Sequence, residues 1–147
     1  MARAPRAWLL AALLAAPPVL AAEFKCVAEN AAVLYDAPSR AAVALYVVSR
    51  DYPLEVVVNT EAWVKVRDHT GALSWIERKS LSDRRMVVVT AVSAPAYVRP
   101  EEGAPVAFAA AQNVSLELME IAPGGWARVR HADGTNGYVR AAQLWGL

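Results

Sequence analysis

The residue types that carry out nucleophilic and metal chemistry are scarce in this sequence, which holds one cysteine, Cys26, and two histidines, His69 and His131. A cysteine nucleophile needs a nearby base and a lowered pKa, and a zinc site needs three or four ligands. The adjacent acids Glu101–Glu102 could supply the two carboxylates of a glycosidase, but they lie in a polar turn beside Gly103. We therefore predict no catalytic residue, no metal site and no cofactor.

Aromatic side chains beside charged ones are the better functional candidates, because such neighbours combine apolar contact with hydrogen bonding. Three tyrosines stand at loop edges, each with a charged residue next to it or two positions away. A shallow ligand groove is predicted from six residues, which are Tyr35, Asp36, Asp51, Tyr52, Tyr97 and Arg99. Such a groove suits peptide or sugar.

These side chains must be positioned by a unit that occurs twice. The segments Trp63–Ile76 and Trp126–Val139 each begin with a tryptophan and an alternating stretch, turn at a glycine, and return with an aromatic–aliphatic pair. Alternation on both sides of a glycine turn is typical of a β-hairpin. The fold-defining residues of the two hairpins are predicted to be Trp63, Gly71, Trp75, Trp126, Gly134 and Tyr138.

The duplication extends beyond the hairpins to most of the chain. A shift of 62 or 63 residues keeps aromatic, glycine and proline positions in register, as with Tyr35 and Tyr97. The same alignment sets Cys26 opposite Val88. Because a position that accepts valine is a packing position, a buried side chain is favoured for Cys26 over a reactive thiol or a nucleophile.

Alternation of polar and β-branched residues predicts short strands in both repeats. In repeat 1, residues 23–84, they are expected near 24–28, 43–48, 53–58, 62–68 and 73–77; in repeat 2, residues 85–147, near 86–91, 105–110, 115–121, 126–131 and 136–140. A single helical turn is expected around Lys79–Leu81, and another around Ala141–Gln143. Strands this short and evenly spaced predict an all-β chain of two small barrels, packed together by their short connection.

The first 22 residues have the three parts of a secretory signal peptide. Arg3 and Arg6 form the basic region, residues 8–16 the apolar run, and Leu20–Ala22 the small residues at the cleavage position. This apolar run is far shorter than the roughly 20 residues that a membrane span needs. The segment is therefore expected to be a cleaved signal and not a membrane anchor, and no span is expected after cleavage. Loss of the two arginines lowers the basic residues from 15 to 13 against 14 acidic ones, which does not favour nucleic acid. The protein is predicted to be exported, to the periplasm or another extracytoplasmic site.

The order of these features resembles the bacterial SH3-like (SH3b) domain. Both repeats contain a first strand, a proline-containing loop, a leucine-rich strand, Trp-x-(Lys/Arg)-Val-Arg, a glycine turn and an aromatic–aliphatic pair. The resemblance implies a barrel of five or six strands, and a role in binding cell-wall peptide or glycan. Val33–Asp36 is also similar to the aromatic–acidic motif of eukaryotic SH3 domains, but the Pro-Ser-Asn-Tyr segment of their groove is missing, so polyproline recognition is not expected.

Two functions follow from these patterns. The first is a non-catalytic exported binding module that recognises cell-wall peptide or glycan, or an envelope protein. The alternative is a structural or scaffolding module of the envelope, with a protein partner and no small ligand. A hydrolase fragment is the least favoured hypothesis, and the sequence assigns no oligomeric state.

Overall fold

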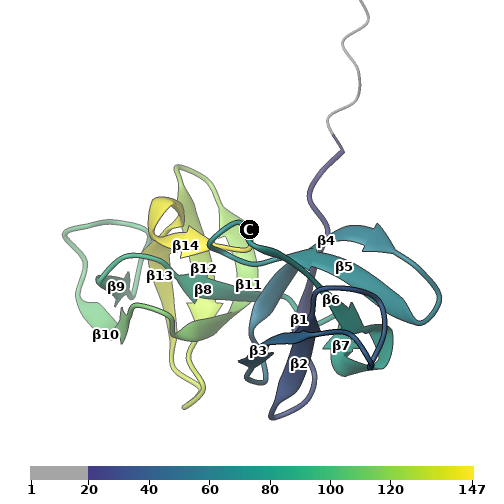
Figure 1. Cartoon of the computed structure of the whole chain (residues 1–147). Helices are drawn as coiled ribbons and strands as arrows, with labels where there is room; N and C mark the ends of the chain where they lie inside the picture. The colour runs from purple at the N-terminus through teal and green to yellow at the C-terminus, as the bar shows by residue number, and fades with distance from the viewer. Residues whose placement is uncertain (1–19) are drawn as a thin grey trace, which may run out of the picture.

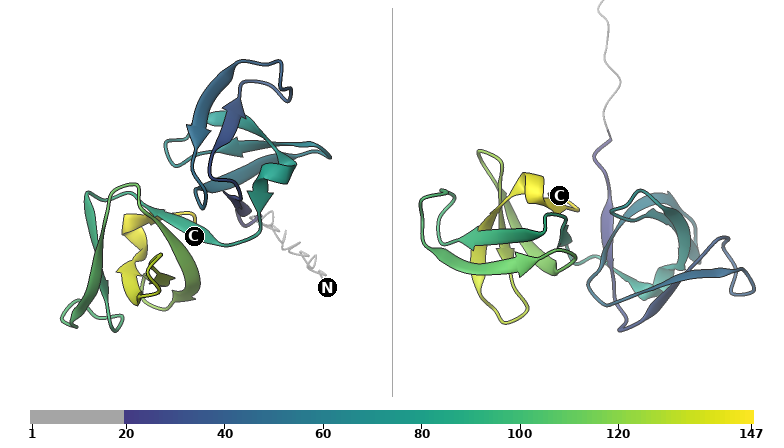
Figure 2. Two further views of the ribbon diagram at one scale, coloured as in Figure 1. Left: turned by 90° about the horizontal axis from the view of Figure 1, so that it is seen from below. Right: turned by 60° about the vertical axis from the view of Figure 1, so that its left-hand side comes forward.

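The structure is a computed structural model that describes residues 20–147. It consists of two seven-stranded antiparallel sheets that lie side by side, the first drawn in purple to teal and the second in green to yellow (Figures 1 and 2). The predicted all-β class is confirmed. The predicted signal peptide, 1–22, falls almost entirely on residues outside the described range. From residue 20 onward, the structure has no helix long and apolar enough to cross a membrane.

Repeat 1 forms the first sheet, whose strand order is β3-β2-β6-β5-β4-β1-β7. The strands are β1 (Phe24–Val27), β2 (Ala32–Tyr35), β3 (Ala44–Val48), β4 (Pro53–Asn59), β5 (Trp63–Arg67), β6 (Leu73–Glu77) and β7 (Leu81–Ser82), with the 3-10 helix η1 (Arg78–Ser80) before β7. The expected alternation is present in β5, where Val64 and Val66 are fully buried and Lys65 lies on the opposite face.

Repeat 2 forms the second sheet with the equivalent order, β10-β9-β13-β12-β11-β8-β14. Its strands are β8 (Met86–Val89), β9 (Ser93–Tyr97), β10 (Val106–Ala111), β11 (Ser115–Ala122), β12 (Trp126–Arg130), β13 (Asn136–Arg140) and β14 (Leu144–Trp145), with η2 (Ala141–Gln143) before β14. The alanine-rich segment forms the edge strand β10. Identical strand order in the two sheets supports the duplication inferred from the sequence.

The two predicted small barrels are not found as closed barrels. Within the described chain, the end strands β3 and β7 of the first sheet are not hydrogen-bonded to each other, and neither are β10 and β14 of the second. The last strand of each sheet has only two residues and pairs only with the first strand of its repeat. Two residues supply too few backbone groups to join both neighbours, so each sheet is curved but open.

The strand prediction missed the inner strands β2 and β9. β2 has only four residues, and its Leu34 is buried while Tyr35 is half-buried. Pro95 interrupts the sequence pattern of β9, because proline lacks the N–H that a strand donates. Both strands nevertheless pair on two sides, with β3 and β6 in repeat 1 and with β10 and β13 in repeat 2.

Each repeat has its own hydrophobic core. The first is built from Val27, Ala32, Leu34, Leu54, Val64, Val66 and Ile76. The second contains Val87, Val89, Ala94, Ala96, Leu116, Val129, Val139 and further apolar residues. Gly71 and Gly134 close the two hairpin turns with φ of 91° and 92°, a conformation that other residues adopt only with strain.

The two repeats touch through their short connection and the C-terminus. The Phe24 ring meets the edge of the Trp145 ring, with centroids 5.1 Å apart. Arg84 lies in the connection and pairs with Asp51 of repeat 1 at 2.9 Å and with Glu117 of repeat 2 at 3.7 Å. These contacts agree with the expectation that the repeats pack together.

Candidate functional site

A tyrosine–tryptophan pair forms the centre of the candidate site in repeat 1. Tyr35 ends β2 and Trp63 begins β5, and their rings meet edge to face with centroids 5.6 Å apart and an interplanar angle of 84°. The neighbours Leu34 and Val64 are buried in the core, so strand alternation turns Tyr35 and Trp63 to the outer face of the sheet. Both rings are half-buried.

Repeat 2 builds the same pair from the aligned positions. Tyr97 ends β9 and Trp126 begins β12, with ring centroids 5.8 Å apart and an interplanar angle of 90°. The edge-to-face arrangement is the favoured geometry for aromatic rings. The outer face of each sheet therefore carries an aromatic pair at an equivalent place.

An ion pair stands beside each aromatic pair, and its charges are exchanged between the repeats. In repeat 1, Arg40 of the β2–β3 loop donates two hydrogen bonds to Glu77 at the end of β6, at 2.6 and 2.9 Å. In repeat 2, Glu102 takes the place of Arg40, and Arg140 at the end of β13 takes the place of Glu77. The Nε of Arg140 donates to Glu102 at 3.0 Å. The same loop-to-strand pair is thus made with reversed polarity.

The exchange changes what covers each tryptophan. The Cζ of Arg140 lies 4.1 Å from the centre of the Trp126 ring, and Trp126 is only 4% exposed. In repeat 1, the residue paired with Trp63 across the β5–β6 ladder is the acidic Glu77. Among the described residues no cation lies over the Trp63 ring, which remains half-buried.

Glu77 lies between two shallow depressions on the surface of repeat 1. One, of about 130 Å³, is lined by residues that include Glu29, Tyr35, Arg40, Lys79 and Ser80. The other, of about 310 Å³, is lined by Glu61, Ala62, Glu77, Arg78 and Lys79. The hydrogen bonds from Arg40 hold the pKa of Glu77 below its usual value of 4.5. The surface therefore offers carboxylates and cations beside an aromatic pair, which suits polar recognition.

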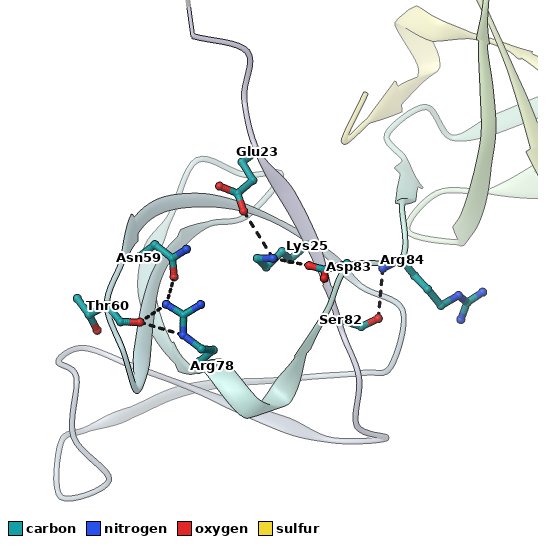
Figure 3. A network of polar contacts seen from close by, with 8 residues as sticks. All are labelled: Glu23, Lys25, Asn59, Thr60, Arg78, Ser82, Asp83 and Arg84. Atoms are coloured by element: carbon teal, nitrogen blue, oxygen red, sulfur yellow. Dashed lines mark hydrogen bonds and ion pairs between the residues drawn. The ribbon is translucent and has the colours of Figure 1, made fainter.

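Arg78 fixes the β4–β5 turn that leads into Trp63. Its side chain reaches Asn59 and the carbonyl of Thr60, as Figure 3 shows, and its Nε also donates to the carbonyl of Glu61 at 2.9 Å. In the same view Lys25 lies between Glu23 and Asp83 at the other side of the sheet. The donors of Arg78 are therefore used within the β4–β5 turn, and its side chain is not directed at the Trp63 ring or at Glu77.

The structure brings together only part of the predicted groove. Tyr35 and Tyr97 belong to the aromatic pairs, but they lie in different sheets. Asp36 accepts a hydrogen bond from the backbone N–H of Val43 at 3.0 Å and so organises the β2–β3 loop. Arg99 lies in the β9–β10 loop, where it pairs with Glu101 at 3.7 Å.

Asp51 and Tyr52 make their contacts elsewhere. Asp51 has φ of 67° and pairs with Arg84 at the junction of the repeats. The Tyr52 hydroxyl contacts Nδ1 of His69, and their rings pack edge to face. The six residues predicted for one groove are therefore distributed over the two sheets and their junction, and they do not converge on one surface.

The remaining candidate residues have structural surroundings. Cys26 is 1% exposed, and burial raises the pKa of its thiol, as expected for a packing position. His131 packs on Phe108 and lies 3.2 Å from Asp133. Trp75 and Tyr138, predicted as fold-defining, are half-buried on the outer face. Over residues 20–147, the structure contains no group of three or more metal-ligating side chains.

The two ion pairs were not predicted from the sequence, although the sequence contains a signal for them. The alignment that matches Tyr35 with Tyr97 also sets Arg40 opposite Glu102, and it sets Glu77 opposite Arg140. A reversal of sign at two aligned positions indicates that the two positions face each other. That signal has meaning only when both positions are considered together.

A known protein family matches the chain twice, once in each repeat. The family model described as "Bacterial SH3 domain" matches residues 28–83 and again residues 90–146. No curated protein matches the chain.

Several solved structures are similar to the chain at low identity. NlpC2 from Trichomonas vaginalis is 17% identical with a TM-score of 0.40, over 85% of this chain and 48% of that one. NlpC1 from the same organism is 18% identical with a TM-score of 0.40, over 92% and 50%. An NlpC/P60 family protein from Bacillus cereus ATCC 10987 is 18% identical with a TM-score of 0.39, over 83% and 55%. The chain spans about half the length of these proteins.

Proposed function

The chain belongs to the bacterial SH3 domain family, and on that premise we propose that it is a non-catalytic exported binding protein that recognises cell-wall peptide or glycan. The export signal is the predicted signal peptide, residues 1–22, and the working location is the periplasm or another extracytoplasmic site. Repeat 1, residues 23–84, and repeat 2, residues 85–147, are the proposed domains. The separate core in each repeat supports this division.

One observation carries the proposal: the outer face of each sheet holds an aromatic pair flanked by an ion pair. Tyr35 and Trp63 have Arg40 and Glu77 beside them. The half-buried rings of Tyr35 and Trp63 provide apolar contact area, and the neighbouring charged groups provide directed hydrogen bonds to peptide or sugar. A non-catalytic role is supported by Cys26, whose buried thiol with a raised pKa lacks the exposed thiolate that a nucleophile needs.

The proposal is tested by co-sedimentation of residues 23–147 with purified cell-wall sacculi. We expect retention of the wild-type protein, and loss of retention when Tyr35→Ala and Tyr97→Ala are combined. A Tyr46→Ala variant is a matched control, because Tyr46 is an exposed tyrosine on the edge strand β3 that pairs with Leu34 and makes no ring contact with Tyr35 or Trp63. Circular dichroism checks that the variants are folded. Equal retention of the folded double variant and the wild type would reject the aromatic faces as the site, and no retention of the wild type would reject wall binding.

A protein partner in the envelope is the second candidate function, and the edge strand β3 favours it. Leu45, Tyr46 and Val47 are exposed on β3 and Val43 is exposed just before it, whereas the aligned strand β10 carries mostly alanine. An exposed apolar edge strand is open to pairing with another chain. Crosslinking in the envelope tests this function. A partner protein that is crosslinked to the wild type and to Tyr35→Ala, but not to Tyr46→Ala, would support it.

A further inference from the structure

We infer that the Trp63 face of repeat 1 is an open site for a cationic group of the ligand, an ammonium or a guanidinium, whereas the Trp126 face of repeat 2 is filled by Arg140 of the chain itself. This inference deepens the proposed function and rests on it for the identity of the natural ligand. It makes the two repeats unequal. Repeat 1 binds, and repeat 2 contains its own substitute for a ligand.

Repeat 2 shows the filled arrangement. The guanidinium of Arg140 lies over the Trp126 ring at 4.1 Å, a distance at which the negative face of an indole attracts a cation. Two acceptors hold it there, the Glu102 carboxylate at 2.9 Å and the Gly124 carbonyl at 3.2 Å. Arg140 thus contacts both the Trp126 ring and the Glu102 carboxylate, and Trp126 is only 4% exposed.

Repeat 1 keeps the ring and the carboxylate of this set but lacks the cation over the ring. The position of Arg140 is taken by Glu77, which is directly paired with Trp63 across the β5–β6 ladder. A carboxylate gains nothing from the negative face of an indole, so Glu77 does not cover the Trp63 ring as Arg140 covers Trp126, and Trp63 stays half-buried. The depression lined by Glu61, Ala62 and Glu77 adjoins this place. A ligand cation on Trp63 would have Glu77 as its counter-ion.

The groups that now neutralise Glu77 can be displaced. Arg40 is on a loop and its side chain is 64% exposed, while Lys79 lies 3.4 Å from Glu77 with a similarly exposed side chain. Exposed ion pairs contribute little stability, because water screens them and ordering two long side chains costs entropy. Arg78 is held by the β4–β5 turn instead. A ligand cation can therefore displace Arg40 and Lys79 from Glu77, because it gains the contact with the Trp63 ring that these two side chains lack.

The first test follows the Trp63 and Trp126 indole N–H signals by NMR in residues 23–147. The probe is the peptide acetyl-Ala-Ala-Arg-Ala-Ala-amide, and its neutral counterpart contains citrulline in place of arginine. We expect a saturable shift of the Trp63 signal with the arginine peptide, binding about tenfold weaker for the citrulline peptide, and an unmoved Trp126 signal. Equal binding of the two peptides, or no shift of Trp63, would overturn the inference.

The second test exchanges the ion pairs. The double variant Arg40→Glu/Glu77→Arg gives repeat 1 the charges of repeat 2, so we expect a folded protein with Trp63 covered and probe binding lost. The reverse variant Glu102→Arg/Arg140→Glu should uncover Trp126 and add a second site that shifts its indole signal. Unchanged probe binding by the folded Arg40→Glu/Glu77→Arg protein would contradict the inference.

These outcomes separate the inference from the proposed function. A wild-type protein that binds the arginine peptide at Trp63 but is not retained by sacculi supports the cation site and rejects wall binding. A wild-type protein retained by sacculi, with retention unchanged in Arg40→Glu/Glu77→Arg, leaves wall binding standing and rejects the cation site as the place where the wall ligand binds.

Discussion

Replacing Arg140 with alanine should destabilise the protein clearly more than replacing Arg40. Arg140 lies over the Trp126 ring at 4.1 Å, and a partly exposed cation–π contact is worth about 1 kcal/mol. Its ion pair with Glu102 is exposed and adds only about 0.2–0.5 kcal/mol. We therefore expect Arg140→Ala to lower the free energy of unfolding by about 1–1.5 kcal/mol. Arg40 pairs with Glu77 at the surface but covers no aromatic ring, so Arg40→Ala should lower the free energy of unfolding by distinctly less than Arg140→Ala.

Urea unfolding followed by tryptophan fluorescence measures this difference. Glu102→Ala is the matched control, because it removes the ion pair and leaves Arg140 free to stay on the ring, so its cost should be close to that of Arg40→Ala. Arg140→Ala should also change the fluorescence of the folded protein, because it uncovers Trp126. Equal destabilisation by Arg140→Ala and Arg40→Ala, with unchanged fluorescence, would refute the argument that Arg140 fills the Trp126 face.

Three further predictions follow from the structure. A Cβ added at Gly137 would lie 2.7 Å from the Cβ of Ala96, so Gly137→Ala should lower the free energy of unfolding by about 1–3 kcal/mol. Gly103 has open space around it, so Gly103→Ala is the control and should be nearly neutral; thermal unfolding measures both variants. Burial raises the pKa of the Cys26 thiol, so the folded state holds the thiol proton more tightly than the unfolded state. The free energy of unfolding in urea should therefore decline between about pH 8.5 and 9.5, below the pH at which tyrosine and lysine titrate, and the decline in this range should be absent in Cys26→Val. Arg40 lowers the pKa of Glu77 from its usual value of 4.5, so Glu77 stays charged down to that pH. Binding of the arginine peptide should therefore be constant from pH 8 to about 5 and should weaken only below 4.5. The Glu77→Gln variant, which lacks the charge, should bind the peptide weakly at every pH.

The architecture was predictable because its signals are local and occur twice. Alternation in β5, a glycine turn and a returning aromatic residue lie within one hairpin of the sequence. The duplication also predicted that Cys26 is buried, since Val88 occupies its place in repeat 2. Strand β2 was missed because its sequence, Ala-Val-Leu-Tyr, has no polar residue and so shows no alternation, and its pairing depends on β3 and β6, which lie further along the chain.

The candidate site was less predictable because it depends on how loops return to the sheet. Asp51 and Tyr52 were grouped with Tyr35 because all three stand at loop edges, but the sheet directs them to other surroundings. Arg40 and Glu77 are far apart in sequence and meet only after the β2–β3 loop folds over β6. Distances along the chain carry no information about such a contact, although the reversed charges in repeat 2 do.

The most direct test of the account compares two single variants in sacculus co-sedimentation, Tyr35→Ala in repeat 1 and Tyr97→Ala in repeat 2. Each removes one half of an equivalent aromatic pair, so the variants are matched in chemistry and in place. The account predicts that Tyr35→Ala loses retention while Tyr97→Ala is retained like the wild type. Retention of folded Tyr35→Ala together with loss in Tyr97→Ala, or equal retention of both, would contradict it.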